Sequence, residues 1–405
     1  MLYNDREKYN IPLIESKRLT FDSISGILLY KEQRKKSFEM KQMGQAFHPS
    51  ILPIDSELIK TDIFFDELID ASTSLEVYKE KIKDSKLDRA WFLPTLQQKE
   101  ALASSMIEGT QASLDGVLVN RVVPDKKDVD IQEVLNYDAA TEYGYRYLKR
   151  GDFDKDFILD LHKILLSGKV RKQTDQIGEF RTHQNYVGTM GRKREITYTP
   201  PEPEMVGKLI DNLIEYIEKP KDNYRSLVRI AIIHAQFETI HPFMDGNGRV
   251  GRILIPLYLY YVEQIDMPCF FVSEAFERDK LKYYTLLNNI RNKNEWSEWI
   301  KFFLITVKNQ CDKYIRMISD INLLYEKDLE KASGLVRTGN MRTLINLLYK
   351  YPIVNSSTIA QCSDIPSATI NRYLNVLVDA DILYTDDKCR NRTYFYYDLL
   401  NILRE

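Results

Sequence analysis

Residues 241–252 combine the residue types needed to hold a polyphosphate, in the order His-Pro-Phe-Met-Asp-Gly-Asn-Gly-Arg-Val-Gly-Arg. Gly246 and Gly248 let the backbone turn and approach a ligand closely. A very apolar helix is expected after them, and the free amides at its start form an anion site that the helix dipole reinforces. Arg249 and Arg252 lie three residues apart in that helix, so their charges are neighbours on its surface. The segment therefore predicts a pocket for several phosphate groups.

Two more side chains in this segment add chemistry to the pocket. Asp245 supplies the hard carboxylate oxygen that a magnesium ion bridging phosphates requires. His241 stands just before the loop, where a neutral imidazole can take a proton from an attacking hydroxyl. Each feature alone has an ordinary structural explanation, because Gly-Asn-Gly often forms only a turn. A Walker P-loop is excluded, because the segment has no Gly-Lys-Ser/Thr. Together the features predict a magnesium–polyphosphate site with a general base.

The same twelve residues resemble the signature of the Fic (Fido) family, His-Pro-Phe-x-Asp/Glu-Gly-Asn-Gly-Arg-x-x-Arg, and every fixed position is present. The resemblance continues in a hairpin region, 178–201, which starts with Gly-Glu-Phe-Arg and ends with Tyr-Thr-Pro-Pro. It also includes Tyr283, Tyr284 and residues 296–303, and covers roughly residues 90–310. It implies a mostly α-helical Fic core with a β-hairpin flap.

This resemblance implies a protein adenylyltransferase (AMPylator), which moves AMP from ATP to a Ser, Thr or Tyr hydroxyl of a target protein. His241 would be the base, Asp245 would hold Mg2+ across the α- and β-phosphates, and Asn247 would lie near the α-phosphate. Arg252 would grip the γ-phosphate, and Tyr284 would line the adenine pocket. The nucleotide-binding residues would be Gly246, Asn247, Gly248, Arg249, Val250, Gly251, Arg252 and Tyr284. The flap would pair with the extended backbone of the target as an added strand.

A second motif, residues 104–109, reads Ser-Ser-Met-Ile-Glu-Gly. It resembles the inhibitory motif of the family, Ser/Thr-x-x-x-Glu-Gly/Asn. Ser104 and Glu108 are four residues apart, so they share one face of a helix. The resemblance implies that Glu108 forms a salt bridge with Arg252 and removes the group that should hold the γ-phosphate. Inhibition within one chain is the simplest arrangement, and the same glutamate could position a water for removing AMP.

Helical periodicity dominates the chain, so the fold class is mostly α. The elements expected around the signature are helices at 96–113, 134–150, 157–167, 205–218, 225–240, 250–262 and 296–330, with a hairpin turn at 188–191. Helix 225–240 is apolar on nearly every face and should be central, and Pro256 should kink or briefly break the helix that follows the signature. We expect an N-terminal helical region at 1–90 and a Fic domain at 91–330 whose inhibitory helix covers about 96–113.

The last segment, 331–405, predicts a linker at 331–340 and then a winged helix-turn-helix domain. Its helices are expected at 341–351, 356–362 and 366–378, and its two strands at 382–384 and 393–397. The third helix should expose polar residues and bury apolar ones, namely Ser367, Thr369, Asn371, Arg372 and Asn375 outside and Ile370, Leu374, Leu377 and Val378 inside. From Leu335 to Glu405 eight basic and seven acidic residues nearly cancel. Because DNA-binding domains normally carry a basic excess, protein interaction or dimerisation is favoured over DNA binding.

Composition limits the remaining choices. The net charge of −2 over 405 residues gives no global attraction to nucleic acid or to an anionic membrane. Four widely spaced cysteines form no zinc or redox motif and indicate buried, reduced thiols. The first residues do not resemble a signal peptide, and the longest apolar run, 253–262, covers about half a membrane span. The expected location is therefore the cytoplasm.

Three functions remain open. The first is the adenylyltransferase, whose partners would be a target protein, a second copy in a homodimer, and the chain itself through self-modification. The second is a nucleotide-sensing, DNA-binding transcription regulator with a Fic core. The third is a transferase that moves phosphate, phosphocholine or UMP, against which the complete signature and the inhibitory glutamate favour ATP and AMP.

Overall fold

The structure is a computed structural model that describes residues 45–405, apart from 125–127, 172–173, 191–193, 268, 337, 387 and 389–390. The described chain is mostly α-helical, as the sequence predicts. It divides into a large unit, Phe47–Asn185 with Pro200–Glu405, and a second unit that includes Tyr186–Thr199. Residues 1–44 of the predicted N-terminal helical region lie outside the described part.

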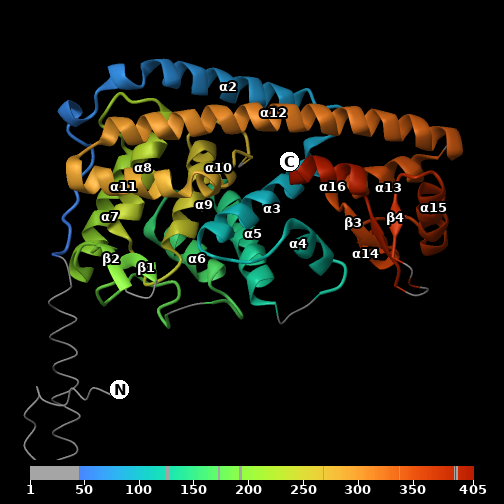
Figure 1. The fold of residues 1–405 in the computed structure, drawn as a ribbon, viewed down its shortest axis with the longest axis horizontal. Coiled ribbons are helices and arrows are strands. Elements are labelled where there is room, and N and C mark those ends of the chain that lie inside the picture. The colour runs from blue at the N-terminus through green and yellow to red at the C-terminus, as the bar shows by residue number, and fades with distance from the viewer. Residues whose placement is uncertain are drawn as a thin grey trace, which may run out of the picture. The chain divides into compact units, whose positions relative to one another are not determined.

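Helices of the large unit surround the signature. They are α2 (Phe65–Lys83), α3 (Arg89–Ile107), α4 (Leu114–Asn120), α5 (Val129–Leu148), α6 (Lys155–Leu165), α7 (Pro203–Glu218), α8 (Ser226–Ile240), α9 (Asn247–Tyr261), α10 (Ser273–Arg278), α11 (Lys280–Lys293) and α12 (Trp296–Leu335). Two short 3-10 turns, Ser56–Leu58 and Thr61–Ile63, precede α2. In α8 every residue from Leu227 to Ile240 except Arg229 is buried, which confirms a central helix. Figure 1 shows α2 running alongside α12.

The helix that carries the inhibitory motif differs from the predicted 96–113 at both ends. It begins earlier because the Asp88 side chain accepts a hydrogen bond from the amide of Ala90 and caps it. It ends at Ile107 because Gly109 adopts a φ of +97°, which breaks the helical path. Ser113 instead caps α4, since its hydroxyl accepts from the amide of Gly116.

Pro256 does not interrupt α9, contrary to the predicted break. The helix is continuous from Asn247 to Tyr261 with Pro256 inside it. Proline removes the hydrogen bond to the carbonyl of Arg252, and its ring crowds the same carbonyl. The residues from Arg249 to Leu259 are all buried, so packing on every side holds the helix together across that gap.

The linker predicted at 331–340 is much shorter than expected. Helix α12 continues to Leu335, and α13 (Gly339–Lys350) begins four residues later. Asp328 and Ala332 are buried, and the hydroxyl of Tyr349 donates to Asp328 Oδ2 over 2.9 Å. Contact between α12 and α13 thus stabilises the helix through Gly334, which the glycine-rich sequence alone does not indicate.

The hairpin consists of β1 (Val187–Met190) and β2 (Arg194–Tyr198), paired antiparallel with Gly188 opposite Ile196. The predicted turn at 188–191 is therefore misplaced. Its first three residues belong to β1, and the connection, 191–193, lies outside the described residues. Pairing with β2 keeps residues 188–190 in a strand, although the glycines at positions 188 and 191 favour a turn there.

The C-terminal segment contains the expected helices α13, α14 (Ser356–Gln361) and α15 (Ser367–Asp379), and the expected strands β4 (Tyr384–Thr385) and β5 (Thr393–Phe395). Two elements were not predicted, β3 (Ile353–Asn355), which pairs with β5, and the final helix α16 (Tyr397–Arg404). In α15 the pattern is as predicted, with Ile370, Leu374 and Leu377 buried and Ser367, Asn371, Arg372 and Asn375 exposed, whereas Thr369 and Val378 are half-buried.

The cysteines only partly follow expectation. Cys269 and Cys311 are buried free thiols, but Cys362 is exposed at the end of α14, because that helix lies at the surface. Cys389 lies outside the described residues. Among the described helices, none combines the length and the apolar character needed to cross a membrane.

Candidate active site

His241 directly follows α8 in a left-handed conformation, with φ at +50°. Arg181 holds its backbone, because the guanidinium Nε donates to the carbonyl of His241 over 2.9 Å. The ring Nδ1 lies 3.4 Å from the carbonyl oxygen of Glu238. A carbonyl only accepts, so Nδ1 carries the proton and Nε2 is the acceptor. Burial, reinforced by the charge of Arg291, lowers the pKa of His241 to about 4. The ring is therefore neutral at physiological pH, as a base must be.

The loop after His241 is closed by amide side chains. Asn247 Oδ1 accepts from the amide of Phe243 and its Nδ2 donates to the carbonyl of Phe243, both over 2.8 Å. Asn185 Nδ2 also donates to that carbonyl, over 2.7 Å. The side chain of Asn247 thus shapes the loop, although the sequence places it at the α-phosphate. Only its backbone amide, in the first turn of α9, points to an anion site.

The start of α9 has the backbone expected of an anion site. Gly246 caps it with φ at +80°, a conformation that favours glycine. The Arg249 side chain is 4% exposed, and its Nη1 lies 3.8 Å from Glu133 Oε1. Its Nε and Nη1 have no hydrogen-bond partner among the described residues. Val250 is fully buried, and its side chain packs in the core.

The structure brings the inhibitory motif and the last signature arginine together. Arg252 Nε donates to Ser104 Oγ over 2.8 Å, and Arg252 Nη2 donates to Glu108 Oε1 over 2.7 Å. Arg252 is 1% exposed, whereas the Glu108 side chain is 35% exposed. A Cβ at Gly248 would lie 2.3 Å from Glu108 Oε1, so the carboxylate rests directly on the backbone of α9. Burial raises the pKa of Glu108, but the charge and hydrogen bond of Arg252, together with the charges of Arg249 and Lys280, lower that pKa overall.

Asp245 is the one carboxylate of the signature. Its Oδ1 accepts from the amide of Gly246 over 2.7 Å. Among the residues that the structure describes, no group of three His, Cys, Asp or Glu side chains could hold a metal ion. Magnesium is commonly bound by one or two carboxylates together with substrate phosphates. Asp245 therefore fits magnesium only when a nucleotide supplies the other ligands.

His162 on α6 supports the loop and was not identified from the sequence. The amide of Gly178 donates to its Nδ1 over 3.0 Å, so Nε2 carries the proton and donates to the carbonyl of Asp245 over 3.1 Å. The ring stacks on Phe243 with centroids 3.8 Å apart. A single histidine in an amphipathic helix carries no sequence signal for this role.

We expect His162→Ala to lower the free energy of unfolding by about 3 kcal/mol, because it empties a fully buried ring site and breaks two hydrogen bonds. Urea denaturation of the purified protein measures this loss. His183→Ala is the control, since His183 is exposed and should change stability by less than about 0.5 kcal/mol. Equal stability of the two variants would contradict a structural role for His162.

Tyr283 and Tyr284 have different environments. Tyr283 is buried, and its hydroxyl lies 2.9 Å from Nε2 of His234, whose Nδ1 donates to the carbonyl of Gly251 over 3.0 Å. Tyr284 is 36% exposed and its ring centroid lies 5.1 Å from that of Tyr283. Tyr283 therefore anchors α11 to α9, and Tyr284 offers an accessible ring beside the charged cluster.

Glu100 fixes α3 to α10. It is 1% exposed and accepts hydrogen bonds from the amide and hydroxyl of Ser273 and from the hydroxyl of Tyr137. Burial raises its pKa from 4.5 to about 7. The folded state therefore binds the proton more tightly than the unfolded state between these values.

Because of Glu100, the free energy of unfolding should fall by about 3 kcal/mol as pH rises from 4.5 to 7. Below 4.5 both states hold the proton, and above 7 neither does. Glu100→Gln should flatten this part of the stability–pH profile, measured by urea denaturation at several pH values. Glu298→Gln, at an exposed site, should leave the profile unchanged. If the free energy of unfolding of Glu100→Gln falls as steeply with pH as that of the wild type, the raised pKa of Glu100 is contradicted.

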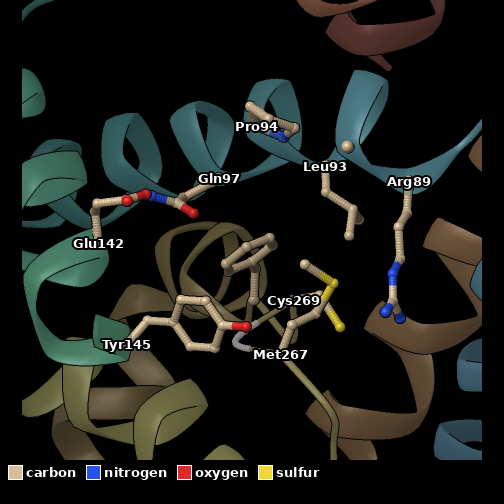
Figure 2. Close-up of a pocket in the computed structure, with 10 residues that line it drawn as sticks. Arg89, Leu93, Pro94, Gln97, Glu142, Tyr145, Met267 and Cys269 are labelled. Atoms are coloured by element: carbon tan, nitrogen blue, oxygen red, sulfur yellow. The ribbon is translucent and has the colours of Figure 1, made fainter. Parts of the chain in front are cut away.

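A cavity of about 140 Å³ lies away from this site. Figure 2 shows Leu93, Pro94 and Gln97 of α3 on one side of it and Tyr145 and Cys269 on the other. No residue of the 241–252 segment lines it. The candidate active site is the cluster around His241 and Arg252, where Glu108 pairs with the arginine.

Comparisons with known proteins match two segments of residues 65–259 to one family. The Fic/DOC family model matches residues 152–259, and the Fic/DOC family N-terminal model matches residues 65–146. The protein adenylyltransferase Fic of Drosophila willistoni is 27% identical over 248 residues, which is 57% of this chain and 45% of that relative. That of Drosophila melanogaster is 27% identical over 228 residues, or 53% of this chain and 41% of the relative.

The chain thus spans less than half the length of these curated relatives. A crystal structure of a Fic family protein from Desulfovibrio desulfuricans G20 superposes with a TM-score of 0.52 at 18% identity, over 87% of this chain and 98% of that one. This likeness supports the fold. With both family models matched in sequence order and the complete signature placed at the start of α9, the chain belongs to the Fic/DOC family.

Proposed function

We propose that the chain is a protein adenylyltransferase that moves AMP from ATP to a Ser, Thr or Tyr hydroxyl of a target protein. The observation that carries this proposal is a neutral imidazole, His241, at the entrance to the anion site of α9. The Drosophila relatives, which carry the name protein adenylyltransferase Fic, support the same activity.

The reaction would begin with the hydroxyl of the target. Its oxygen attacks the α-phosphorus while its proton passes to Nε2 of His241. The bond from the α-phosphorus to the bridging oxygen breaks, pyrophosphate leaves, and AMP remains on the target. The first-turn amides of α9 stabilise the charge on the phosphate oxygens. Asp245 would hold magnesium with the phosphates, and the bound ion would neutralise part of their charge.

The same site contains a built-in brake. While Glu108 pairs with Arg252, the guanidinium is unavailable to the γ-phosphate, and the carboxylate repels any phosphate brought close to Gly248. Both groups lie in one chain, so inhibition requires no partner. Outward movement of the end of α3 would remove the carboxylate and admit ATP in a productive position. The same carboxylate could then orient a water for the reverse removal of AMP.

The C-terminal segment, which we propose to be a winged helix-turn-helix, would recruit a protein or a second copy of this chain. It contacts the brake helix, because Thr95 Oγ1 donates to the carbonyls of Tyr349 and Lys350, each over 3.3 Å. A partner bound there is therefore in a position to act on α3.

The exposed polar residues of α15 support a second candidate function, a nucleotide-sensing DNA-binding regulator. A gel shift at moderate salt tests this candidate. A cytoplasmic location stays an expectation from the sequence.

Mass spectrometry tests the proposed activity. The Glu108→Gly protein is incubated with ATP, magnesium and cell lysate, and modified peptides are identified. The expected product is AMP on Ser, Thr or Tyr of a target or of the protein itself. Phosphate, UMP or phosphocholine adducts, or none that depends on the added protein, would contradict the proposal.

A further inference from the structure

Glu238 is a buried glutamate that the proposed reaction does not use. It lies in the last turn of α8, three residues before His241, and is 7% exposed. Its Oε1 has no hydrogen-bond partner among the described residues. A buried polar atom without a partner costs free energy, and it is uncommon in native proteins. Such an atom beside an active site points to a partner that arrives with the ligand.

Glu238 of α8 lies against α9 in the same way as Glu108 does. A Cβ at Gly251 would lie 2.5 Å from Glu238 Oε1, just as a Cβ at Gly248 would lie 2.3 Å from Glu108 Oε1. The two glycines are three residues apart, so they are neighbours on one face of the helix. Glu108 and Glu238 therefore cover successive positions on that face, and Arg252 interacts with both carboxyl groups.

The surroundings of Glu238 favour a neutral part of a nucleotide. A phosphate would be repelled by the carboxylate, and the phosphate site lies at the other glycine and at the first turn of α9. Glu238 interacts electrostatically with Tyr284, whose ring is partly exposed and available for stacking on a base. Arg291 interacts with the same carboxyl from α11. These neighbours suit a base, which can stack on an aromatic ring, more than a sugar.

We propose that Glu238 selects the nucleotide by accepting a hydrogen bond from the exocyclic amino group of adenine; this rests on the proposed adenylyltransferase function. Burial raises the pKa of Glu238 to about 7, so the carboxyl group is ionised above that pH, where the comparison is made. It then only accepts, so it pairs with an amino group and repels a carbonyl at the same position. The 6-amino group of adenine fits this requirement. Guanine, hypoxanthine and uracil present a carbonyl oxygen there and are disfavoured.

The test compares ATP with ITP, which has a carbonyl in place of the 6-amino group. In the Glu108→Gly background, kcat/KM for AMP transfer from ATP should exceed that for IMP transfer from ITP by about 10- to 100-fold. Glu238→Gln should reduce this ratio by about 10-fold, because the amide can donate to a carbonyl. An unchanged ratio in a folded variant would overturn the proposal.

Glu100→Gln in the same background is the matched control, because it also removes a buried glutamate whose pKa is raised to about 7. It should leave the ATP/ITP ratio unchanged. The melting curve shows whether Glu238→Gln is folded. If it is not, the test uses the Glu108→Gly protein alone, and equal kcat/KM values for ATP and ITP reject the role of Glu238. A variant that changes discrimination against 2′- or 3′-deoxy-ATP instead assigns Glu238 to the ribose and rejects the base.

Calorimetry separates this inference from the proposed function. Binding of ATP and ITP to the Glu108→Gly protein should show the same preference as catalysis. A preference for ATP that depends on Glu238, found without any AMP transfer, would support the inference and reject the adenylyltransferase. Transfer of AMP with no preference between ATP and ITP would support the adenylyltransferase function and reject the inference about Glu238.

Discussion

Replacing Glu108 with glycine is expected to raise AMP transfer, including self-modification, by about 10- to 100-fold, the range of a typical coupling between two sites. The variant removes the carboxylate that pairs with Arg252 and rests on Gly248, so the guanidinium becomes available for the γ-phosphate. The Ser104 hydroxyl still accepts from Arg252 and keeps that side chain in place. Incorporation of label from ATP into protein measures the effect.

Glu108→Gly both removes the carboxylate and loosens the end of α3, so these two possible causes of higher activity must be distinguished. Met106→Gly is the matched control, because Met106 is exposed in the same last turn of α3 and makes no ion pair. It weakens the helix by about 1 kcal/mol while leaving Glu108 intact. A Glu108→Gly protein no more active than wild type, or a Met106→Gly protein equally activated, would count against the brake.

Replacing His241 should abolish AMP transfer, with a loss of at least about 100-fold from the missing general base. The measurement is best made in the Glu108→Gly background, where activity is highest. Nucleotide binding should survive, because the amides of α9 and Arg252 are unchanged. Calorimetry with ATP measures that binding.

Backbone conformation makes the choice of substituent important. His241 has φ at +50°, where alanine adds strain but asparagine is tolerated more readily. His241→Asn therefore removes the base with little strain, and His241→Ala adds a loss of stability. Both variants should be equally inactive. Activity retained by His241→Asn would show that the imidazole shapes the turn and does not accept the proton.

The chemistry of the loop was predictable because it is encoded in consecutive residues. His241, Asp245 and the two glycines lie within eight positions, and the helix that follows is strongly apolar. Local spacing therefore indicates an anion site with a base and a hard oxygen ligand. The pairing of Ser104 and Glu108 with Arg252 was expected from a family resemblance, since no local rule connects positions so far apart in the chain.

Several expectations failed where packing overrides local preference. Pro256 lies inside an unbroken α9 because its neighbours are buried on all sides. Gly334 lies near the end of α12 because Asp328 and Tyr349 hold that helix against α13. In both cases the propensity cost of one residue is smaller than the tertiary contacts around it.

The sequence by itself determined which reactive groups this protein has, and their spacing predicts a nucleotide site of the Fic type. Only the tertiary structure decided how those groups are used. It shows that the Asn247 amide closes the loop and that His162 supports Asp245 from another helix. It also shows that Glu238 Oε1, which has no hydrogen-bond partner among the described residues, lies against Gly251. These roles depend on contacts between residues distant in sequence, and such contacts arise only when burial of the helices brings the residues together.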